Sequence, residues 1–261
     1  MARVDRYDGH VAVVTGASSG LGRRLALDLA DRGAAVVGVA RSRDALERLA
    51  DESKGTIDPA ACDVSDEAAI STLLADIERQ RGSVDVLVNS AGWAEPTKVE
   101  QADLDLYHRI FATNFFGLVA ATLAVVPGML HRGRGIVVNV SSDHGRAPAP
   151  GTPAYSSSKA AVSAFTESLA HECHGRGVHL HVLYPGWVPT PLGQGAVDAG
   201  MPQPPNIVRR TEEQVSAATL RAMGRPGIEI NCAPVATLAP VMRALLPPVY
   251  RAQMRKQANR G

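Results

Sequence analysis

The sequence is poor in cysteine and in aromatic residues and has no long apolar run. Its 261 residues include three cysteines, Cys62, Cys173 and Cys232, and 4% aromatic residues. Three scattered thiols do not make a disulfide framework, so we expect small buried side chains in a reducing compartment. No stretch reaches the roughly 18 apolar residues of a membrane-spanning helix, and the first ten residues, MARVDRYDGH, lack the apolar core of a secretory signal. We therefore expect a cytoplasmic protein without a membrane span.

The charges are balanced and have no blocks of one sign. The 27 basic and 26 acidic residues are interspersed and leave a net charge of +1. A nucleic-acid-binding protein needs a concentrated basic surface, so this pattern argues against a nucleic-acid partner. A hydrophobic content of 45% is ample for a large core.

Short apolar runs alternate with longer segments of helical pattern. Buried parallel strands read as continuous apolar runs, and parallel strands need crossover connections, usually helices. The pattern predicts an α/β fold, a doubly wound Rossmann-type three-layer sandwich with a central, mostly seven-stranded parallel sheet. The five clearer strands are expected at 11–16, 34–40, 84–90, 135–142 and 178–186, and two weaker ones at 56–63 and 227–232.

No shift in composition divides the chain, so we expect one domain over residues 1–261. Residues 189–210 are rich in proline and glycine and predict a substrate lid, since a loop of this length is usually functional. A C-terminal extension, 233–261, holds apolar segments broken by proline and the basic residues Arg251, Arg255, Lys256 and Arg260. We expect it to pack on the protein's own body; a subunit contact and a membrane surface are the alternatives.

A glycine-rich turn follows the first expected strand. Gly16, Gly20 and Gly22 stand between that strand and an amphipathic helix, where missing side chains let the backbone approach a pyrophosphate. The spacing is G-x-x-x-G-x-G and not the commoner G-x-G-x-x-G, so the turn alone is weak support for a dinucleotide site. Its alternative is a turn with no ligand.

The end of the second strand predicts the cofactor type. Ala40 and Arg41 occupy the place where an NAD site puts an acidic residue against the ribose hydroxyl. A small residue followed by a guanidinium suits a 2′-phosphate, so NADP(H) is preferred to NAD(H). The alternative is a solvated loop before the next helix.

Taken together, the motifs resemble those of the short-chain dehydrogenase/reductase family in its compact single-domain form. The resemblance covers about residues 8–232 and implies an oxidoreductase that interconverts a ketone or aldehyde and an alcohol. The motifs occur in the family's order, as TGASSGLG (15–22), CDVSD (62–66), NSAG (89–92), TNFFG (113–117), VNVSS (138–142), YSSSK (155–159) and PGWVPT (185–190).

The resemblance implies four catalytic residues. Tyr155 would be the general acid or base, and Lys159, one helical turn later, would stabilise its phenolate, because an unperturbed phenol has a pKa of about 10. Ser142 would hydrogen-bond the substrate oxygen, with Ser141 as the alternative. Asn114 would help to hold a water beside the lysine.

The resemblance also implies a set of cofactor contacts. One position departs from the family's N-N-A-G, with Ser90 in place of the second asparagine, a change we expect to be tolerated. The expected contacts are Gly16, Ser18, Ser19, Gly20, Leu21, Gly22, Arg41, Asp63, Val64, Asn89, Ala91, Gly92, Tyr155, Lys159, Pro185, Gly186, Val188 and Thr190.

The segments after the strands predict a substrate pocket that suits a bulky, largely apolar ketone or secondary alcohol. His144 either touches the substrate or, as we expect, is an exposed loop residue. The histidines of HECH (171–174) and HLH (179–181) do not form H-E-x-x-H, so no metal is expected.

The family implies a homodimer or homotetramer, formed through helices at about 100–130 and 153–174. The alternative function is a non-catalytic protein that senses NAD(P) on the same fold.

Overall fold

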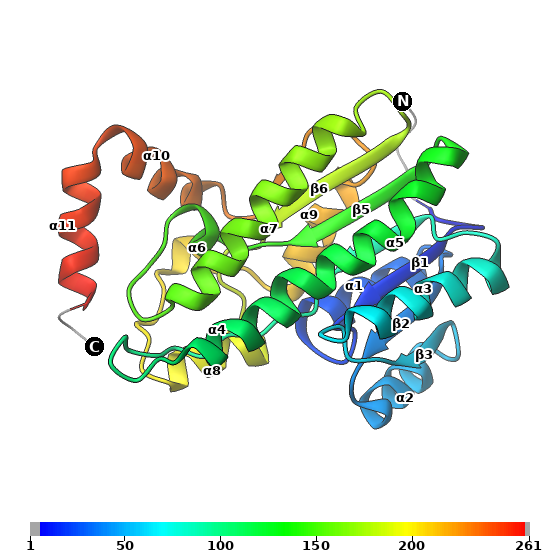
Figure 1. Cartoon of the computed structure of the whole chain (residues 1–261), viewed down its shortest axis with the longest axis horizontal. Coiled ribbons are helices and arrows are strands. Elements are labelled where there is room, and N and C mark those ends of the chain that lie inside the picture. Colours follow the sequence, from blue (N-terminus) through cyan, green and yellow to red (C-terminus); the bar gives the residue numbers. More distant parts are fainter. Residues whose placement is uncertain (1–5, 259–261) are drawn as a thin grey trace.

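A parallel sheet of seven strands forms the middle layer of the protein (Figure 1). The computed structural model describes residues 6–258. All neighbouring strands pair in parallel. Their order across the sheet is β3 (Ile57–Ala61), β2 (Ala35–Ala40), β1 (Val11–Thr15), β4 (Val86–Asn89), β5 (Gly135–Val140), β6 (Val178–Tyr184) and β7 (Glu229–Asn231).

Successive side chains of a strand point to opposite faces of the sheet, and helices cover both faces, so the apolar strands are buried on both sides. Ala12 and Val14 of β1 belong to one buried cluster, and Val11 and Val13 belong to the other. Helices α1 (Gly20–Asp31), α2 (Arg43–Glu52) and α9 (Glu212–Ala222) supply the first cluster. On the opposite face, α3 (Glu67–Arg81), α5 (Gly117–Arg132) and α7 (Pro153–Glu172) supply the second. The predicted doubly wound sandwich is confirmed.

The two strands with the weaker sequence signal are the edges of the sheet. Pro59 lies within β3 and cannot donate to a ladder, and an edge strand tolerates this. At the other edge, β7 has only three residues. Short or proline-containing edges also limit pairing with other chains.

One long apolar helix runs along the outside of the sandwich. Helix α4 (Leu104–Phe111), a π-helical turn η1 (Ala112–Phe116) and α5 continue as a single helix of 29 residues, long and apolar enough by composition to cross a membrane. In this protein, 44% of the most apolar 18-residue stretch of the helix is buried. Val125 and Met129 belong to the second buried cluster, on the face of the sheet that α5 covers.

The strand order reverses between β1 and β4, whose following connections leave toward opposite sides. In doubly wound sheets this point opens a crevice beyond the carboxyl ends of the strands. The shorter elements gather at this end, on the left of Figure 1. They are α6 (Asp143–Arg146), α8 (Pro191–Asp198), η2 (Asn206–Val208), η3 (Pro234–Thr237), α10 (Leu238–Leu245) and α11 (Pro247–Ala258).

The expected lid, 189–210, is an excursion closed at its base. Trp187 N–H donates to the Val208 carbonyl at 3.0 Å, and Arg210 N–H donates to the Trp187 carbonyl at 2.8 Å. Helix α8 lies inside the excursion, capped by Thr190 Oγ1, which accepts from Gly193 N–H. The assignment of residues 1–261 to one domain stays a prediction.

Candidate active site

A cavity of about 600 Å³ opens at the crevice. It is large enough for a cofactor-sized molecule. Of the expected cofactor contacts, all except Asn89 line it, and so do three of the four expected catalytic residues, Ser142, Tyr155 and Lys159. The structure therefore brings together residues that follow six different strands, β1 to β6.

The glycine turn leaves the start of α1 open to the cavity. Ser19 is the N-cap of α1 but makes no capping hydrogen bond through its side chain, so it covers none of the first backbone N–H groups. A Cβ atom at Gly22 would lie 2.3 Å from the Gly16 carbonyl oxygen. The tight approach needs glycine, and exposed N–H groups at a helix start suit a phosphate.

Two charged side chains line the part of the cavity that lies beyond β2 and β3. Arg41 follows β2, is exposed, and makes no ion pair with any residue in 6–258. Asp63 follows β3, and its Oδ1 accepts hydrogen bonds from the Ser65 N–H at 3.0 Å and the Ser65 hydroxyl at 2.8 Å. The Asp63 carboxylate is thus held in place by Ser65, whereas the Arg41 guanidinium is available to bind an anion.

Tyr155 and Lys159 lie one turn apart on α7. The Lys159 Nζ is 5.9 Å from the centre of the Tyr155 ring and donates a hydrogen bond to the Val140 carbonyl at 2.7 Å. Burial lowers the pKa of Lys159 to about 8. Burial also raises the pKa of Tyr155, while the Ser142 hydroxyl acts in the opposite direction. A cation and a phenol thus share a site screened from water.

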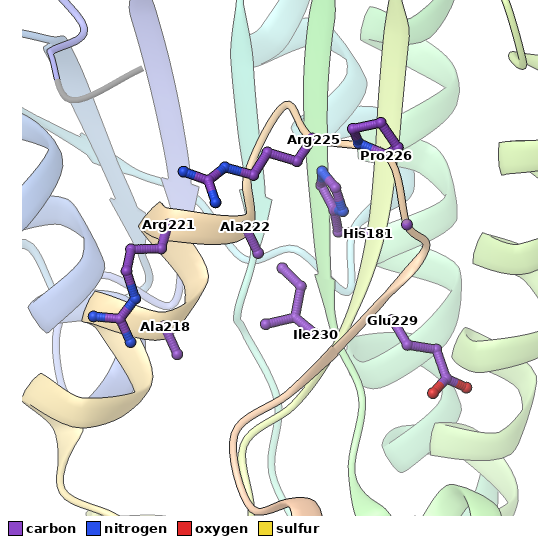
Figure 2. A pocket seen from close by; sticks show the side chains of 9 residues that line it. His181, Ala218, Arg221, Ala222, Arg225, Pro226, Glu229 and Ile230 are labelled. Carbon is purple, nitrogen blue, oxygen red and sulfur yellow. The ribbon is translucent and has the colours of Figure 1, made fainter. Parts of the chain in front are cut away.

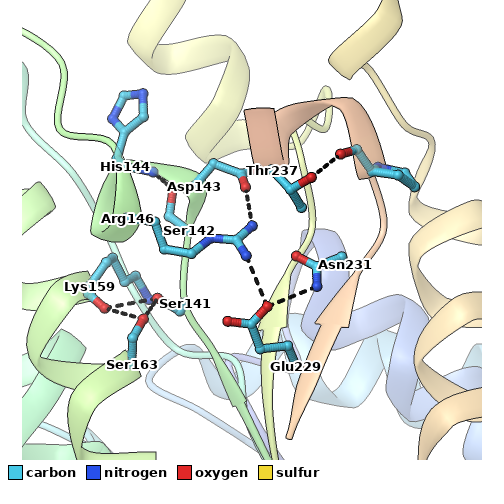
Figure 3. Close-up of polar contacts among 11 residues, drawn as sticks. Ser141, Ser142, Asp143, His144, Arg146, Lys159, Ser163, Glu229, Asn231 and Thr237 are labelled. Carbon is cyan, nitrogen blue, oxygen red and sulfur yellow. Dashed lines mark hydrogen bonds and ion pairs between the residues drawn. The ribbon is translucent and has the colours of Figure 1, made fainter. Parts of the chain in front are cut away.

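The two serines after β5 have different surroundings (Figure 3). Ser141 Oγ is buried, donates to the Lys159 carbonyl at 2.8 Å and pairs with Ser163 Oγ at 2.8 Å. Ser142 Oγ accepts from the His144 N–H at 3.2 Å and has room on the cavity side. The geometry favours Ser142 over Ser141 as the residue that meets a ligand.

Asn114 lies in the π-helical turn and does not line the cavity. Its side chain accepts from the Trp93 N–H and donates to the Trp93 carbonyl, both at 2.9 Å, and donates to Ser158 Oγ at 3.2 Å. These bonds join the segment after β4 to α7. A Cβ at Gly92 would lie 3.2 Å from Asn114 Oδ1 and 3.4 Å from Lys159 Nζ, so the missing side chain keeps the space beside the ammonium open.

Asn89 is buried inside the sheet and does not reach the cavity. Its Nδ2 donates to Thr122 Oγ1 at 3.1 Å and to Asn139 Oδ1 at 2.9 Å. The Asn139 Nδ2 in turn donates a hydrogen bond to Thr166 Oγ1 at 3.0 Å. The side chain therefore supports the strand ends from behind.

The side chain of Arg146 was not expected from the sequence. It forms ion pairs with Asp143 at 2.7 Å and Glu229 at 3.1 Å (Figure 3). Its guanidinium lies 3.5 Å from the centre of the Tyr184 ring. It ties the loop after β5 to β7. In the sequence, the i, i+3 spacing of Asp143 and Arg146 indicates the ion pair between them, and nothing indicates the contacts with Glu229 and Tyr184.

The expectation that His144 is exposed was wrong. The residue is half-buried and lines the cavity, with its ring 6.1 Å from that of Tyr155 in an edge arrangement. Its Nδ1 lies 3.3 Å from Thr152 Oγ1. Burial lowers the pKa of His144, so it is a neutral polar group in the wall. The physical reason is that the short helix α6, which contains His144, packs against α7, so closely that a Cβ at Gly145 would lie 2.8 Å from the Lys159 carbonyl oxygen.

The C-terminal extension also contributes to the wall. Tyr250, Gln253, Met254 and Gln257 line the cavity from one face of α11. The Tyr250 hydroxyl donates to the Pro148 carbonyl at 2.6 Å. Their spacing is helical, yet nothing local in the sequence indicates where this helix docks.

A second, smaller cavity of about 260 Å³ lies between β6, β7 and the end of α9 (Figure 2). Its wall includes His181, Arg221, Arg225 and Glu229 and none of the expected site residues. His181 Nε2 accepts from the Gly224 N–H at 3.1 Å, and burial lowers the pKa of His181 to about 4. This histidine is a structural residue of the β6–α9 contact.

The histidine-rich segments do not converge. The rings of His179 and His181 stack with centres 6.5 Å apart. Across residues 6–258, no three histidine, cysteine or acidic side chains gather as a metal would require.

Comparison with known proteins places this geometry in context. The sequence profile described as short chain dehydrogenase matches residues 10–199. A fungal protein, short chain dehydrogenase MYCFIDRAFT_6125 of Pseudocercospora fijiensis, is 42% identical over 193 residues, which are 72% of this chain and 62% of that protein. The chain thus spans less than two thirds of that relative's length.

Two further proteins match nearly the whole chain. Dehydrogenase/reductase SDR family member 7B of Bos taurus is 33% identical over 265 residues, covering 96% of this chain and 82% of the relative. The crystal structure of a short chain dehydrogenase/reductase from Burkholderia phymatum in complex with NAD superposes with a TM-score of 0.83 at 24% identity, covering 95% and 96% of the two chains. At that identity, the structural likeness shows the fold.

Proposed function

Because the chain belongs to the short-chain dehydrogenase/reductase family and is an oxidoreductase, we propose that it is NADP(H)-dependent and interconverts a ketone or aldehyde and an alcohol. The observation that carries this proposal is the convergence of Ser142, Tyr155 and Lys159 on the cavity that also holds the glycine turn. A merely structural set of residues would have no reason to face one cavity of about 600 Å³.

A nicotinamide cofactor fits this cavity, and we propose NADP(H). The open start of α1 and the close packing of Gly22 would hold the pyrophosphate, Asp63 the adenine side and the Pro185–Thr190 segment the nicotinamide. Arg41, without an acidic neighbour after β2, supports a 2′-phosphate, although the Burkholderia structure carries NAD. When bound, the cofactor supplies or accepts the hydride.

Tyr155 would exchange the proton with the substrate oxygen. Ser142 Oγ faces the same space and would orient that oxygen toward the phenol. The Lys159 ammonium would stabilise the phenolate, which otherwise is disfavoured by burial. Asn114 and Gly92 would keep the space beside Lys159 in which a water can reach its Nζ.

The substrate would be a bulky, largely apolar carbonyl compound or alcohol. Beyond the catalytic residues, the large apolar side chains in the cavity wall include Trp93, Leu192, Met201, Val208 and Met254. His144, neutral and half-buried, is the polar group best placed to meet a second polar atom of the substrate.

We propose that the protein is a homo-oligomer, as the family commonly is. Phe116 and Leu123 lie seven residues apart on the long helix and are 47% and 55% exposed. An apolar row of this kind on an otherwise packed helix suits a contact between copies.

The direct test is a panel of ketones, aldehydes and secondary alcohols assayed with NADPH or NADP⁺ and with NADH or NAD⁺. We expect turnover of apolar bulky substrates, with higher kcat/KM for the phosphorylated cofactor. Binding of NADPH without turnover of any panel member would instead support the NAD(P)-sensing alternative.

A further inference from the structure

The C-terminal hairpin of α10 and α11 stands away from the sandwich (Figure 1). None of the residues of α10 is buried, and in α11 only Tyr250 is. Besides the Tyr250 hydroxyl, Arg243 tethers the hairpin by donating to the Arg146 carbonyl at 2.7 Å. The expected packing on the protein's own body is therefore made by one face of α11 and, from α10, by Arg243 and Ala239.

The outer surface of α10 is a row of exposed apolar side chains. Leu238, Val241 and Leu245 recur at i, i+3 and i+7 and are 61%, 51% and 74% exposed. Leu246, where α10 ends, and Val249 in the first turn of α11 are also exposed, at 56% and 54%. Single exposed aliphatic side chains are common on protein surfaces, whereas several grouped together mark an interaction surface.

Basic side chains accompany this apolar row. Arg251, Arg255 and Lys256 of α11 are exposed and make no ion pair with any residue in 6–258. Lys256 follows Val249 by seven residues, so both lie on the same side of the helix. Lys256 therefore lies beside the end of the apolar row, and Arg255 and Arg251 lie farther round the exposed side of α11.

Acidic and basic residues are distributed differently before and after residue 230, shortly before the hairpin begins. All 26 acidic residues precede residue 230, and the segment from 230 onward contains basic residues but no acidic one. The balanced net charge of +1 therefore hides a cationic C-terminal segment attached to an anionic body. Such a segment attracts an anionic partner by charge complementarity.

We propose that α10 and α11 dock the protein on the surface of an anionic lipid bilayer. The apolar row would enter the boundary between headgroups and acyl chains, and Arg251, Arg255 and Lys256 would meet the headgroups. A projecting hairpin that combines a row of exposed apolar side chains with nearby cations fits a planar anionic lipid surface. The docking does not depend on the proposed function, although the opposite face of α11 lines the cavity and would bring its mouth to the membrane.

The test is sedimentation of the full-length protein with vesicles of phosphatidylcholine alone and of phosphatidylcholine with phosphatidylglycerol. We expect binding to the anionic vesicles, weaker binding to the neutral ones, and loss of the difference at high salt. Val241→Ser/Leu245→Ser and Arg255→Gln/Lys256→Gln should each weaken binding to anionic vesicles by at least about tenfold.

Matched controls separate this surface from exposed residues elsewhere. Val99→Ser removes an apolar side chain that is 75% exposed, and Arg176→Gln removes an exposed charge; both should bind vesicles as the parent protein does. Absence of parent binding to either vesicle, or equal binding by all four variants, would overturn the proposal. So would a fall in oligomer size in Val241→Ser/Leu245→Ser, since the row would then be covered by a second copy. An unchanged melting temperature shows that each variant is folded.

Discussion

The ammonium nitrogen of Lys159 lies 2.7 Å from the carbonyl oxygen of Val140 at the end of β5 and donates a hydrogen bond to it. The side chain is only 4% exposed, and no carboxylate within residues 6–258 forms an ion pair with it. Burial of the charge lowers the pKa of Lys159 to about 8 from 10.5. The site thus contains an ammonium group whose charged form is destabilised by its burial.

This burial predicts a pH-dependent difference between the cofactor-free parent protein and Lys159→Met. Between pH 8 and 10.5 the folded lysine has lost its proton while the unfolded one keeps it, so stability rises with pH. The parent should gain about 2 kcal/mol in free energy of unfolding relative to the variant between pH 7 and pH 9.5. Urea unfolding at the two pH values measures this, and parallel changes in both proteins would contradict the buried-ammonium description.

Gly22→Ala should damage both the fold and the cofactor site. The added Cβ would lie 2.3 Å from the Gly16 carbonyl oxygen, so the turn must shift. We expect a loss of about 1–3 kcal/mol in free energy of unfolding and weaker NADPH binding. Gly195→Ala is the control, because a Cβ there meets nothing within 4 Å. Thermal unfolding and fluorescence titration give the two readouts; unchanged values for Gly22→Ala would refute the tight turn.

Arg41→Ala should alter cofactor preference. Arg41 lines the cavity, and Arg43, which begins α2, does not. Loss of a charge-assisted pair with the 2′-phosphate should weaken NADPH binding by about 1.5–3 kcal/mol, more than tenfold, and leave NADH binding nearly unchanged. Arg43→Ala should change neither. An equal loss for both cofactors in Arg41→Ala would mean that the guanidinium does not read the phosphate.

Phe116→Lys/Leu123→Lys should dissociate the oligomer. Two like charges on the exposed row of the long helix would oppose contact between copies. Light scattering coupled to size-exclusion chromatography should show a smaller species than the parent, whereas Val241→Ser/Leu245→Ser should keep the parent's size. If the helix variant retains that size, the contact lies elsewhere.

Local signals carried much of the fold and of the site. Apolar runs predicted the five clearer strands, because burial on both faces needs uninterrupted aliphatic residues. The two edge strands were predicted from weaker signals, β3 despite its Pro59. The glycine turn and the Tyr155–Lys159 spacing depend on one strand or one helix, so their placement at the cavity followed from short segments.

Long-range contacts are what the sequence could not supply. Arg146 bridges Asp143 and Glu229, which are far apart in the chain, and the binding of Trp93 by Asn114 depends on a π-helical turn. His144 was misplaced because its burial comes from the fold around α6. The position of the α10–α11 hairpin beside the cavity depends on two long-range hydrogen bonds, from Tyr250 to the Pro148 carbonyl and from Arg243 to the Arg146 carbonyl.

The measurement that tests the central claim most directly compares Tyr155→Phe with Tyr107→Phe. Both remove one phenolic hydroxyl, but Tyr107 lies on α4 and does not line the cavity. With the best substrate of the panel, Tyr155→Phe should lower kcat by about 10²–10⁴-fold while its NADPH affinity, measured by fluorescence titration, stays near the parent value. Tyr107→Phe should match the parent in both. A Tyr155→Phe protein that turns over at the parent rate would contradict the assignment of Tyr155 as the proton donor and acceptor.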